Sequence, residues 1–423
     1  MLSRISSLNW CRVFACAGMI VLFSVMVGCQ RETVKDYGRP LPPGHPALRK
    51  ITNPAELPDL RLAYQSVEPS LGPALERSLA WFDKPSTQSH FPVRTIDGQI
   101  THEAARASVY AFMRLLQSST SAHQFIQSVT QEFDIYTSVG WDGSGTVLYT
   151  GYYTPTFNAS FTRTNEYRFP LYKRPADLVT DPITGEVRGR RVGNLLLPSY
   201  PTRAQIEQNN LLEGNELVWL KSRLDAYIIH VNGSARLNMT DGSSIYVGYN
   251  GNNGHEYTSI GRLLVDDGKL DPNRLSIPAI RAYFQENPEQ LDYYLRQNDR
   301  FVFFDQYPGD NWPAGSLGFK VTPMRTLATD KSLFPRACVT LVSTRLTTDG
   351  RPQVFEQFML DQDAGGAIRA PGRADIYMGI GHRAEMLAGR QLEEGRLYYF
   401  ILKPSRVAYW LRELDAARQV ASN

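Results

Sequence analysis

The chain has 423 residues and a mass of 47.7 kDa, and 42% of its residues are hydrophobic while 21% are charged. This ordinary composition excludes a disordered, a collagen-like and a multi-span membrane protein, and the length predicts two or three domains. The 45 Lys and Arg residues against 42 Asp and Glu residues give a net charge of +3. That is no basic excess of the kind that indicates nucleic acid as a partner.

Residues 1–28 are predicted to be a lipoprotein signal peptide. Basic residues precede an apolar stretch at 13–27, which is shorter than the roughly 20 residues of a membrane-spanning helix. The stretch ends in Gly28-Cys29, which resembles the bacterial lipobox. We therefore expect cleavage before Cys29, acylation of Cys29, and anchoring to the periplasmic face of the outer membrane. A plain secretory signal with an incidental cysteine is the alternative.

Cysteine usage predicts a fold without internal disulfides. The four cysteines are Cys11, Cys16, Cys29 and Cys338, and cleavage leaves only the last two. With Cys29 acylated, Cys338 has no partner in the chain. Cys338 lies in the apolar run 337–342 and is predicted to be a buried strand residue.

Changes in hydrophobic period divide the remaining chain into four segments. Residues 29–70 are rich in Pro and are predicted to be a tether. Residues 71–156 hold helices and then the first strand of a β-barrel. Residues 157–300 are predicted to form an inserted α+β domain, and residues 301–423 supply the rest of the barrel.

Single elements support this division in chain order. Val109, Phe112, Met113 and Leu116 have the spacing of one buried helix face. Further along, Thr202 and Gln205 match a capping box that begins a helix. The apolar run 227–231 is predicted to be a short strand. Residues 235–249 alternate around Asp241-Gly242, which predicts a β-hairpin.

Motifs for several common chemistries are missing from the sequence. No two histidines stand three or four residues apart, and no HExxH, P-loop or Gly-x-Ser-x-Gly pattern occurs. We therefore expect no metal site, no nucleotide cofactor and no serine hydrolase.

Carboxylates in the last third of the chain are the remaining candidates for chemistry. Asp330, Asp363 and Asp375 each begin or end a short apolar strand. Gly365-Gly366 permits close backbone approach and positive φ. A barrel could gather these carboxylates in one cleft suited to sugar chemistry. The pattern alone favours a turn role over a catalytic one, because Asp beside Gly is typical of turns.

The string from Asp363 through Gly365-Gly366 to Asp375-Ile-Tyr resembles the three-aspartate (3D) domain. The wider chain is similar to the membrane-bound lytic murein transglycosylase A family. Matching stretches occur in the family's order between about residues 141 and 403; they include 150–155, 169–172, 197–203, 225–227, 233–234, 241–243, 253–261, 301–304 and 379–381.

The resemblance implies a double-psi β-barrel interrupted by the inserted α+β domain, with a substrate groove between them. It implies peptidoglycan glycan strands as the substrate and cleavage of the MurNAc-β-1,4-GlcNAc bond, with 1,6-anhydromuramic products. Cell-wall synthesis proteins are further expected partners. No cofactor is implied.

The resemblance also assigns residues. Asp375 is the single catalytic acid and base, and Asp363 and Asp330 support it. Burial or the charge of Asp363 is expected to raise the pKa of Asp375. The expected glycan contacts are Tyr152, Tyr153, Thr154, Asn253, His255, Gly365 and Gly366. Structural roles stay open for Asp330, Asp363, the barrel aromatics, Asn253 and His255.

Two other functions stay open. A glycan hydrolase would use Asp375 as the acid and Asp361 or Asp363 as the base that activates water. A non-catalytic lipoprotein would bind glycan in the same groove, although binding alone would not require an acid at position 375.

Overall fold

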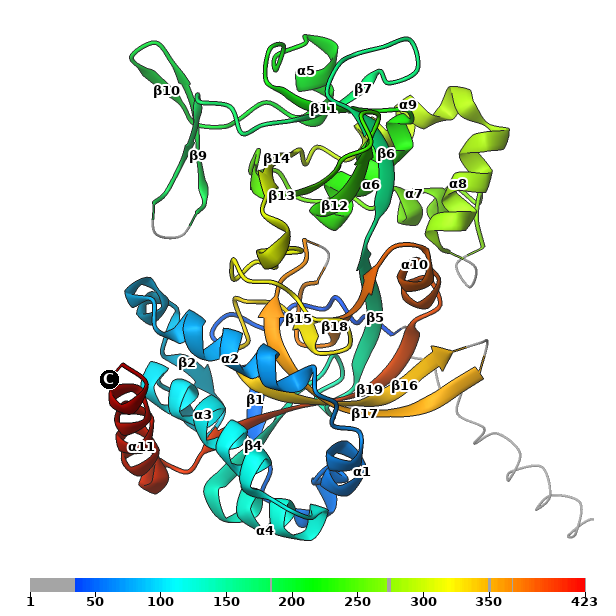
Figure 1. The fold of residues 1–423 in the computed structure, drawn as a ribbon. Helices are drawn as coiled ribbons and strands as arrows, with labels where there is room; N and C mark the ends of the chain where they lie inside the picture. The colour runs from blue at the N-terminus through cyan, green and yellow to red at the C-terminus, as the bar shows by residue number, and fades with distance from the viewer. Residues whose placement is uncertain (1–34, 183–184, 272–274, 349–350, 367, 423) are drawn as a thin grey trace, which may run out of the picture. The chain divides into compact units, whose positions relative to one another are not determined.

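The computed structural model describes residues 35–182, 185–271, 275–348, 351–366 and 368–422. The predicted signal peptide and Cys29 lie outside the described residues. In this described part, no helix is both long enough and apolar enough to cross a membrane. The two main sheets are visible in Figure 1.

The first sheet has eight strands, and six of them close into a barrel. In spatial order the strands are β1 (Leu48–Lys50), β4 (Phe133–Ser138), β19 (Leu392–Leu402), β16 (Val339–Thr348), β17 (Arg351–Asp363), β15 (Thr326–Ala328), β18 (Arg373–Ile380) and β5 (Val147–Thr154). A further pairing of β19 with β5 closes the ring. The pairs β15–β17 and β18–β5 are parallel, and the other pairs of this sheet are antiparallel.

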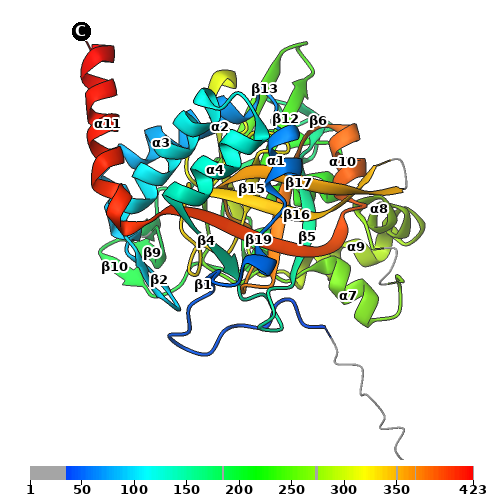
Figure 2. The same ribbon diagram turned by 90° about the horizontal axis from the view of Figure 1, so that it is seen from below.

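Helices cover one side of this sheet, as Figure 2 shows. They are α1 (Leu60–Gln65), α2 (Leu71–Phe82), α3 (His102–Ser118) and α4 (Ala122–Glu132), and α11 (Pro404–Ser422) packs on α3. Phe112 of α3 is fully buried, and its ring centroid lies 5.0 Å from that of Phe358 and 5.5 Å from that of Phe400. The predicted helix face is confirmed, because Val109 and Phe112 are core residues and Met113 and Leu116 pack against them.

The segment predicted as a tether is partly built into the first sheet and its core. Within it, β1 pairs with β4, and Leu48, Leu60 and Ala63 are buried in the main core. The tether prediction is therefore wrong for these residues.

The second sheet has six strands and lies between the barrel strands in sequence. Its order is β14 (Val302–Tyr307), β13 (Ser244–Asn252), β12 (Ser234–Met239), β6 (Thr156–Ser160), β11 (Glu216–Leu220) and β7 (Phe169–Tyr172). After Pro155, β5 of the barrel continues directly into β6 (Figure 1). The hairpin predicted around Asp241-Gly242 is confirmed, because β12 and β13 pair antiparallel across that turn.

Helices and smaller elements surround this sheet. The helices are α5 (Arg203–Gln208), α6 (Arg223–Asn232), α7 (Ile260–Asp266), α8 (Ile277–Glu286) and α9 (Leu291–Arg296), and a small sheet holds β8 (Leu178–Thr180), β9 (Val187–Val192) and β10 (Leu195–Leu197). Among the described residues, the remaining elements are β2 (Val93–Thr95), β3 (Gly98–Ile100), α10 (His382–Ala388) and the short 3₁₀ turns Pro54–Glu56, Pro85–His90, Pro288–Gln290 and Gly309–Asn311.

Two local predictions have opposite outcomes. The capping box is confirmed, because Thr202 accepts from the backbone of Gln205 and the Gln205 side chain accepts from Thr202. The strand predicted at 227–231 is wrong, because these residues belong to α6. Ser222 caps the start of that helix and Gly233, at φ +75°, ends it, so the capping residues decide the structure over the β-branched run.

Cys338 is buried, as predicted, but it lies immediately before β16 and is not a strand residue. Burial raises the pKa of its thiol.

Candidate active site

The register of β15 brings the aspartates together. Ala328, the last residue of β15, pairs with Asp363 of β17 on one side and with Asp375 of β18 on the other. Because neighbouring strands are about 4.8 Å apart, the Cα atoms of these two aspartates lie about 10 Å apart across β15. Asp330 follows just after the end of the same strand. The three aspartates therefore meet at one end of three adjacent strands.

Asp375 combines partial exposure with a raised pKa. Thr150, its register partner on β5, donates a hydroxyl hydrogen bond to Oδ1 of Asp375. Burial raises the pKa of Asp375 to about 6; the positive charge of Arg373 opposes this rise and the negative charge of Asp363 adds to it. This is the direction predicted from the sequence. At pH 7 about one molecule in ten would then carry the proton.

Three hydrogen bonds fix the carboxylate of Asp363. Its Oδ2 accepts from the hydroxyl of Tyr152 at 2.6 Å, and its Oδ1 accepts from the backbone N–H groups of Ser316 at 2.7 Å and Ala364 at 2.8 Å. Burial raises its pKa, whereas these hydrogen bonds and the charge of Lys331 lower it. A Cβ atom at Gly315 would come within 3.0 Å of its carboxyl carbon. Asp363 is thus a fixed neighbour of Asp375 with little freedom to move.

Asp330 organises the loop before β18. Its Oδ1 accepts from the backbone and the hydroxyl of Ser332 at 3.0 and 2.6 Å. Its Oδ2 accepts from the backbone N–H of Ala370 at 3.0 Å. Ala370 has φ +70°, in the left-handed region where residues with a Cβ are strained. The side chain of Asp330 is 6% exposed, so these contacts indicate a structural role.

Asp361 is sequestered in the barrel interior. Its side chain is 0% exposed and forms an ion pair with Lys331. Tyr399 donates to it at 2.7 Å and Thr329 at 2.8 Å. Burial lowers the pKa of Lys331, and the charge of Asp361 opposes that shift. A carboxylate so enclosed has no place for a water molecule to activate, which removes Asp361 as the base of a hydrolase.

Residues 152, 153 and 154 of β5 have different hydrogen-bond partners. Tyr152 is the hydrogen-bond donor to Asp363, and its ring centroid lies 5.1 Å from that of Tyr377. Tyr153 is 5% exposed and donates to Glu385 of α10 at 3.0 Å. Thr154 is 2% exposed and shares a hydrogen bond of 2.9 Å with the hydroxyl of Tyr377. Only Tyr152 reaches the aspartate cluster directly, and the other two pack within the barrel.

Asn253 and His255 bind the backbone of their own region. The amide nitrogen of Asn253 donates to the carbonyls of Pro201 and Asp299 at 2.9 and 2.8 Å, and its oxygen accepts from Phe301 at 2.8 Å. Because both amide hydrogens are used and the residue is 1% exposed, the prediction that Asn253 contacts glycan is corrected to a structural role. His255 is partly exposed, and its Nε2 donates to the carbonyl of Tyr200 at 2.7 Å.

Gly365 and Gly366 lie in the loop after β17. Neither has positive φ, so that part of the prediction is wrong. Close approach does occur, because a Cβ atom at Gly365 would come within 2.8 Å of Ile368. Gly366 faces two residues of the region between the barrel strands, since its Cβ would lie 3.7 Å from Tyr257 and 3.9 Å from Arg300.

Sequence reasoning missed two residues that touch the carboxylates. Thr150 was part of a matching stretch, but only the parallel register of β5 and β18 places it beside Asp375. The backbone N–H of Ser316 comes from a loop whose sequence carries no signal for this contact. Within the described residues, no three His, Cys, Asp or Glu side chains are grouped so as to hold a metal ion.

Comparison with known proteins places this geometry in a family. Residues 148–305 match the family profile described as the MltA specific insert domain, and residues 325–401 match the 3D domain. The membrane-bound lytic murein transglycosylase A of Escherichia coli K12 is 32% identical over 277 residues, which are 64% of this chain and 70% of that protein. The chain belongs to the membrane-bound lytic murein transglycosylase A family.

Other members of this transglycosylase family agree with that assignment. The Vibrio cholerae protein of the same name is 30% identical over 63% of this chain and 68% of its own length. The crystal structure of a membrane-bound lytic murein transglycosylase from Agrobacterium tumefaciens is 26% identical, with a TM-score of 0.69 over 86% of this chain and 99% of that chain. The E. coli MltA structure with bound chitohexaose has the same fold, with a TM-score of 0.64 and 24% identity over 88% of this chain and 98% of that chain. All three aspartates lie inside the 3D match.

Proposed function

We propose that this chain is a lytic transglycosylase of peptidoglycan that cleaves the MurNAc-β-1,4-GlcNAc bond and leaves 1,6-anhydromuramic products. The observation that carries the proposal is Asp375, a partly exposed carboxyl whose pKa is raised to about 6. A group of this kind can give and take a proton near neutral pH. The names of its relatives, lytic murein transglycosylases, support the same reaction.

In the first step, protonated Asp375 gives its proton to the leaving O4 of the glucosamine. The glycosidic bond breaks, and positive charge develops at C1 of the muramic acid. Partial burial favours the protonated acid beforehand. Thr150 donates to Oδ1 of the carboxyl, and Oδ2 is the oxygen that we propose transfers the proton.

In the second step, the Asp375 carboxylate takes the proton of the muramic C6 hydroxyl. That oxygen attacks C1 of the same sugar and closes the anhydro ring, so Asp375 ends protonated as it began. An intramolecular nucleophile has a large advantage in effective concentration over water. The reaction therefore needs one carboxyl, and Asp363 serves to hold Tyr152 and to keep the pKa of Asp375 high.

The two alternatives fit less well. A hydrolase needs a second carboxylate with room for water, yet Asp361 is enclosed with Lys331 and Asp363 is bound by three donors. A binding lipoprotein has no need for a carboxyl whose pKa is raised to about 6.

We further propose the finer architecture that the family implies. The closed six-stranded ring with two parallel pairs suits a double-psi β-barrel, and the segment 157–300 is its inserted domain. Glycan would lie in a groove between them, against Tyr152 and the Gly366 loop, where Tyr257 and Arg300 come close. His255 remains a proposed glycan contact.

We also propose that acylated Cys29 anchors the chain to the periplasmic face of the outer membrane. The support is the lipobox-like sequence and the membrane-bound relatives. Cell-wall synthesis proteins remain proposed partners.

The test incubates the protein with purified peptidoglycan sacculi and identifies the soluble products by mass spectrometry. We expect products lighter by one water than reducing-end muropeptides. The Asp375→Asn variant should release none. Asp241→Asn, a change in an exposed hairpin turn, is the matched control and should behave as the wild type.

Two outcomes would contradict the proposal. Reducing-end products from the wild type would indicate a hydrolase with water as the nucleophile. Binding to sacculi without any released product would indicate a glycan-binding protein.

A further inference from the structure

A cavity of about 180 Å³ lies among β7, α5, α6 and α9, in the segment between the barrel strands. Its lining includes the aromatic residues Phe169, Tyr172 and Phe301, and three arginines described below. No lining residue comes from β15, β17 or β18, which carry the aspartates. The reaction proposed above makes no use of this cavity.

The most deeply buried arginine of the cavity lining is Arg203. Arg203 is 2% exposed, and its guanidinium lies 4.9 Å from the ring centre of Phe301 and 5.1 Å from that of Tyr227. It donates to the carbonyl of Arg300 at 2.7 Å and to Glu207 at 3.3 Å. This packing fixes the charge at the cavity wall before any ligand arrives.

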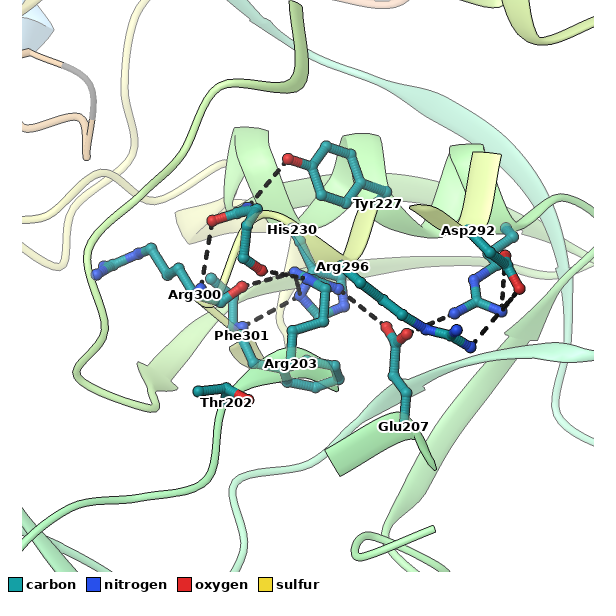
Figure 3. A network of polar contacts seen from close by, with 12 residues as sticks. Thr202, Arg203, Glu207, Tyr227, His230, Asp292, Arg296, Arg300 and Phe301 are labelled. Carbon is teal, nitrogen blue, oxygen red and sulfur yellow. Dashed lines mark hydrogen bonds and ion pairs between the residues drawn. The ribbon is translucent and has the colours of Figure 1, made fainter. Parts of the chain in front are cut away.

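The arginines outnumber the carboxylates that pair with them. Figure 3 shows the chain of contacts that runs from Arg203 through Glu207 to Asp292. Arg223 bridges Glu207 and Asp292, and Arg296 lies 3.7 Å from Asp292. Three guanidinium groups thus face two carboxylates, which leaves one positive charge uncompensated in this network.

Two donors of the lining have no partner among the described residues, and one of them is a buried atom. The Nδ1 of His230 accepts from the backbone N–H of Val302 at 3.1 Å. Burial, together with the charge of Arg203, lowers the pKa of His230 well below its usual value, so the neutral ring carries its hydrogen on Nε2. No hydrogen bond to that Nε2 is formed, and His230 is 7% exposed. The Nε of Arg296 is also buried without a partner.

The free groups define the chemistry of the ligand. Both unpartnered groups are donors, and the network has excess positive charge, so the complement is a group with two acceptor oxygens and a negative charge. Leaving the buried Nε–H of Arg296 unpaired is unfavourable, and arginine pairs well with carboxylates. The volume is smaller than the roughly 300–1,000 Å³ of sites for drug-sized ligands. It suits a terminal carboxylate with a small aliphatic group against the aromatic walls.

We propose that this cavity binds the carboxylate end of a short peptide of the kind that murein carries on its glycan strands. The choice of a murein peptide rests on the proposed function, whereas the carboxylate chemistry rests on the cavity alone. Such a site would let the chain hold peptide-bearing glycan at a second point, apart from Asp375.

The test measures binding of N-acetyl-D-alanyl-D-alanine to the full chain in detergent solution by calorimetry. The probe has no glycosidic bond, so turnover does not interfere. Its C-terminal amide and chitotetraose are the comparison ligands. Arg296→Gln removes the charge and the free Nε donor, and Arg262→Gln removes an arginine that is far more exposed and does not line the cavity. Nitrogen NMR of the His230 ring provides a measurement on the unmodified chain.

We expect the acid to bind at least about tenfold more tightly than its amide, and Arg296→Gln to weaken the acid by about the same factor. Arg262→Gln should bind as the wild type, and the acid should shift the His230 Nε2–H signal. Equal binding of acid and amide, binding of chitotetraose that shifts the same signal, or an unmoved His230 signal would each overturn the proposal. The sacculus assay separates the two ideas. Anhydro products without peptide binding would refute this inference alone, and peptide binding without products would refute the proposed function alone.

Discussion

Replacing Asp375 with asparagine is expected to abolish turnover and, at the same time, to stabilise the folded chain at neutral pH. The folded environment raises the pKa of this carboxyl from 3.8 to about 6, so ionisation is less favourable in the folded state than in the unfolded chain. The folded state therefore binds more protons between these values, and its stability falls as the pH rises through them. Asparagine has nearly the same shape and carries no charge, so it escapes this penalty.

The magnitude follows from the two pKa values. At pH 8 the carboxyl of Asp375 is ionised in both states, and the penalty is about 3 kcal/mol at 1.36 kcal/mol per pKa unit. At pH 5 the folded state is mostly protonated, and the same linkage gives about 1.6 kcal/mol. The advantage of the Asp375→Asn variant should thus grow by about 1.4 kcal/mol between pH 5 and pH 8.

Urea unfolding of both proteins at the two pH values, followed by tryptophan fluorescence, measures this difference. Asp241→Asn provides the contrast, because hydrogen bonds from Ser243 lower the pKa of Asp241 from its usual 3.8. Its carboxylate is therefore ionised in the folded and the unfolded state at both pH values, and the stability of this variant relative to the wild type should be the same at pH 5 and pH 8. The reasoning is refuted if Asp375→Asn is less stable than the wild type at pH 8, or if its advantage is the same at both pH values.

Other predictions follow from the same site. At low substrate concentration, the rate of product release should fall about tenfold per pH unit above about pH 6, because Asp375 loses its proton. Sacculus solubilisation measured against pH tests this, and a rate that stays constant up to pH 9 would contradict the prediction. Thr150→Val removes a donor to the carboxylate, so the fall in rate should move to higher pH. Lys331→Met leaves Asp361 buried without its partner and should destabilise the fold by about 3–5 kcal/mol, whereas adding Asp361→Asn should restore part of this in urea unfolding. Asp330→Ala removes the acceptor of the Ala370 loop and should lower stability by about 1.5–3 kcal/mol, while Asp330→Asn should lose less.

Local pattern was sufficient for several elements of this protein. The helix stripe at Val109 and Phe112, the capping box at Thr202 and the hairpin turn at Asp241-Gly242 depend on neighbours within a few residues, so the sequence alone predicts them. Prediction from local pattern failed at 227–231, where Ser222 and Gly233 cap a helix although the apolar run had indicated a strand. It also failed at Leu48 and Leu60, whose burial depends on β4 and on strands far along the chain.

The candidate site also has features that the sequence predicts and features that only the fold determines. The sequence by itself determined that aspartates stand at the ends of short strands and that the chain resembles one family. Only the tertiary structure decided which aspartate can act. Asp361 and Asp363 lie on the same strand, yet Lys331 encloses the first and Tyr152 holds the second, while Asp375 remains partly open. The physical reason is that a carboxyl's pKa and access depend on desolvation and on partners brought by other strands, and spacing along the chain encodes neither.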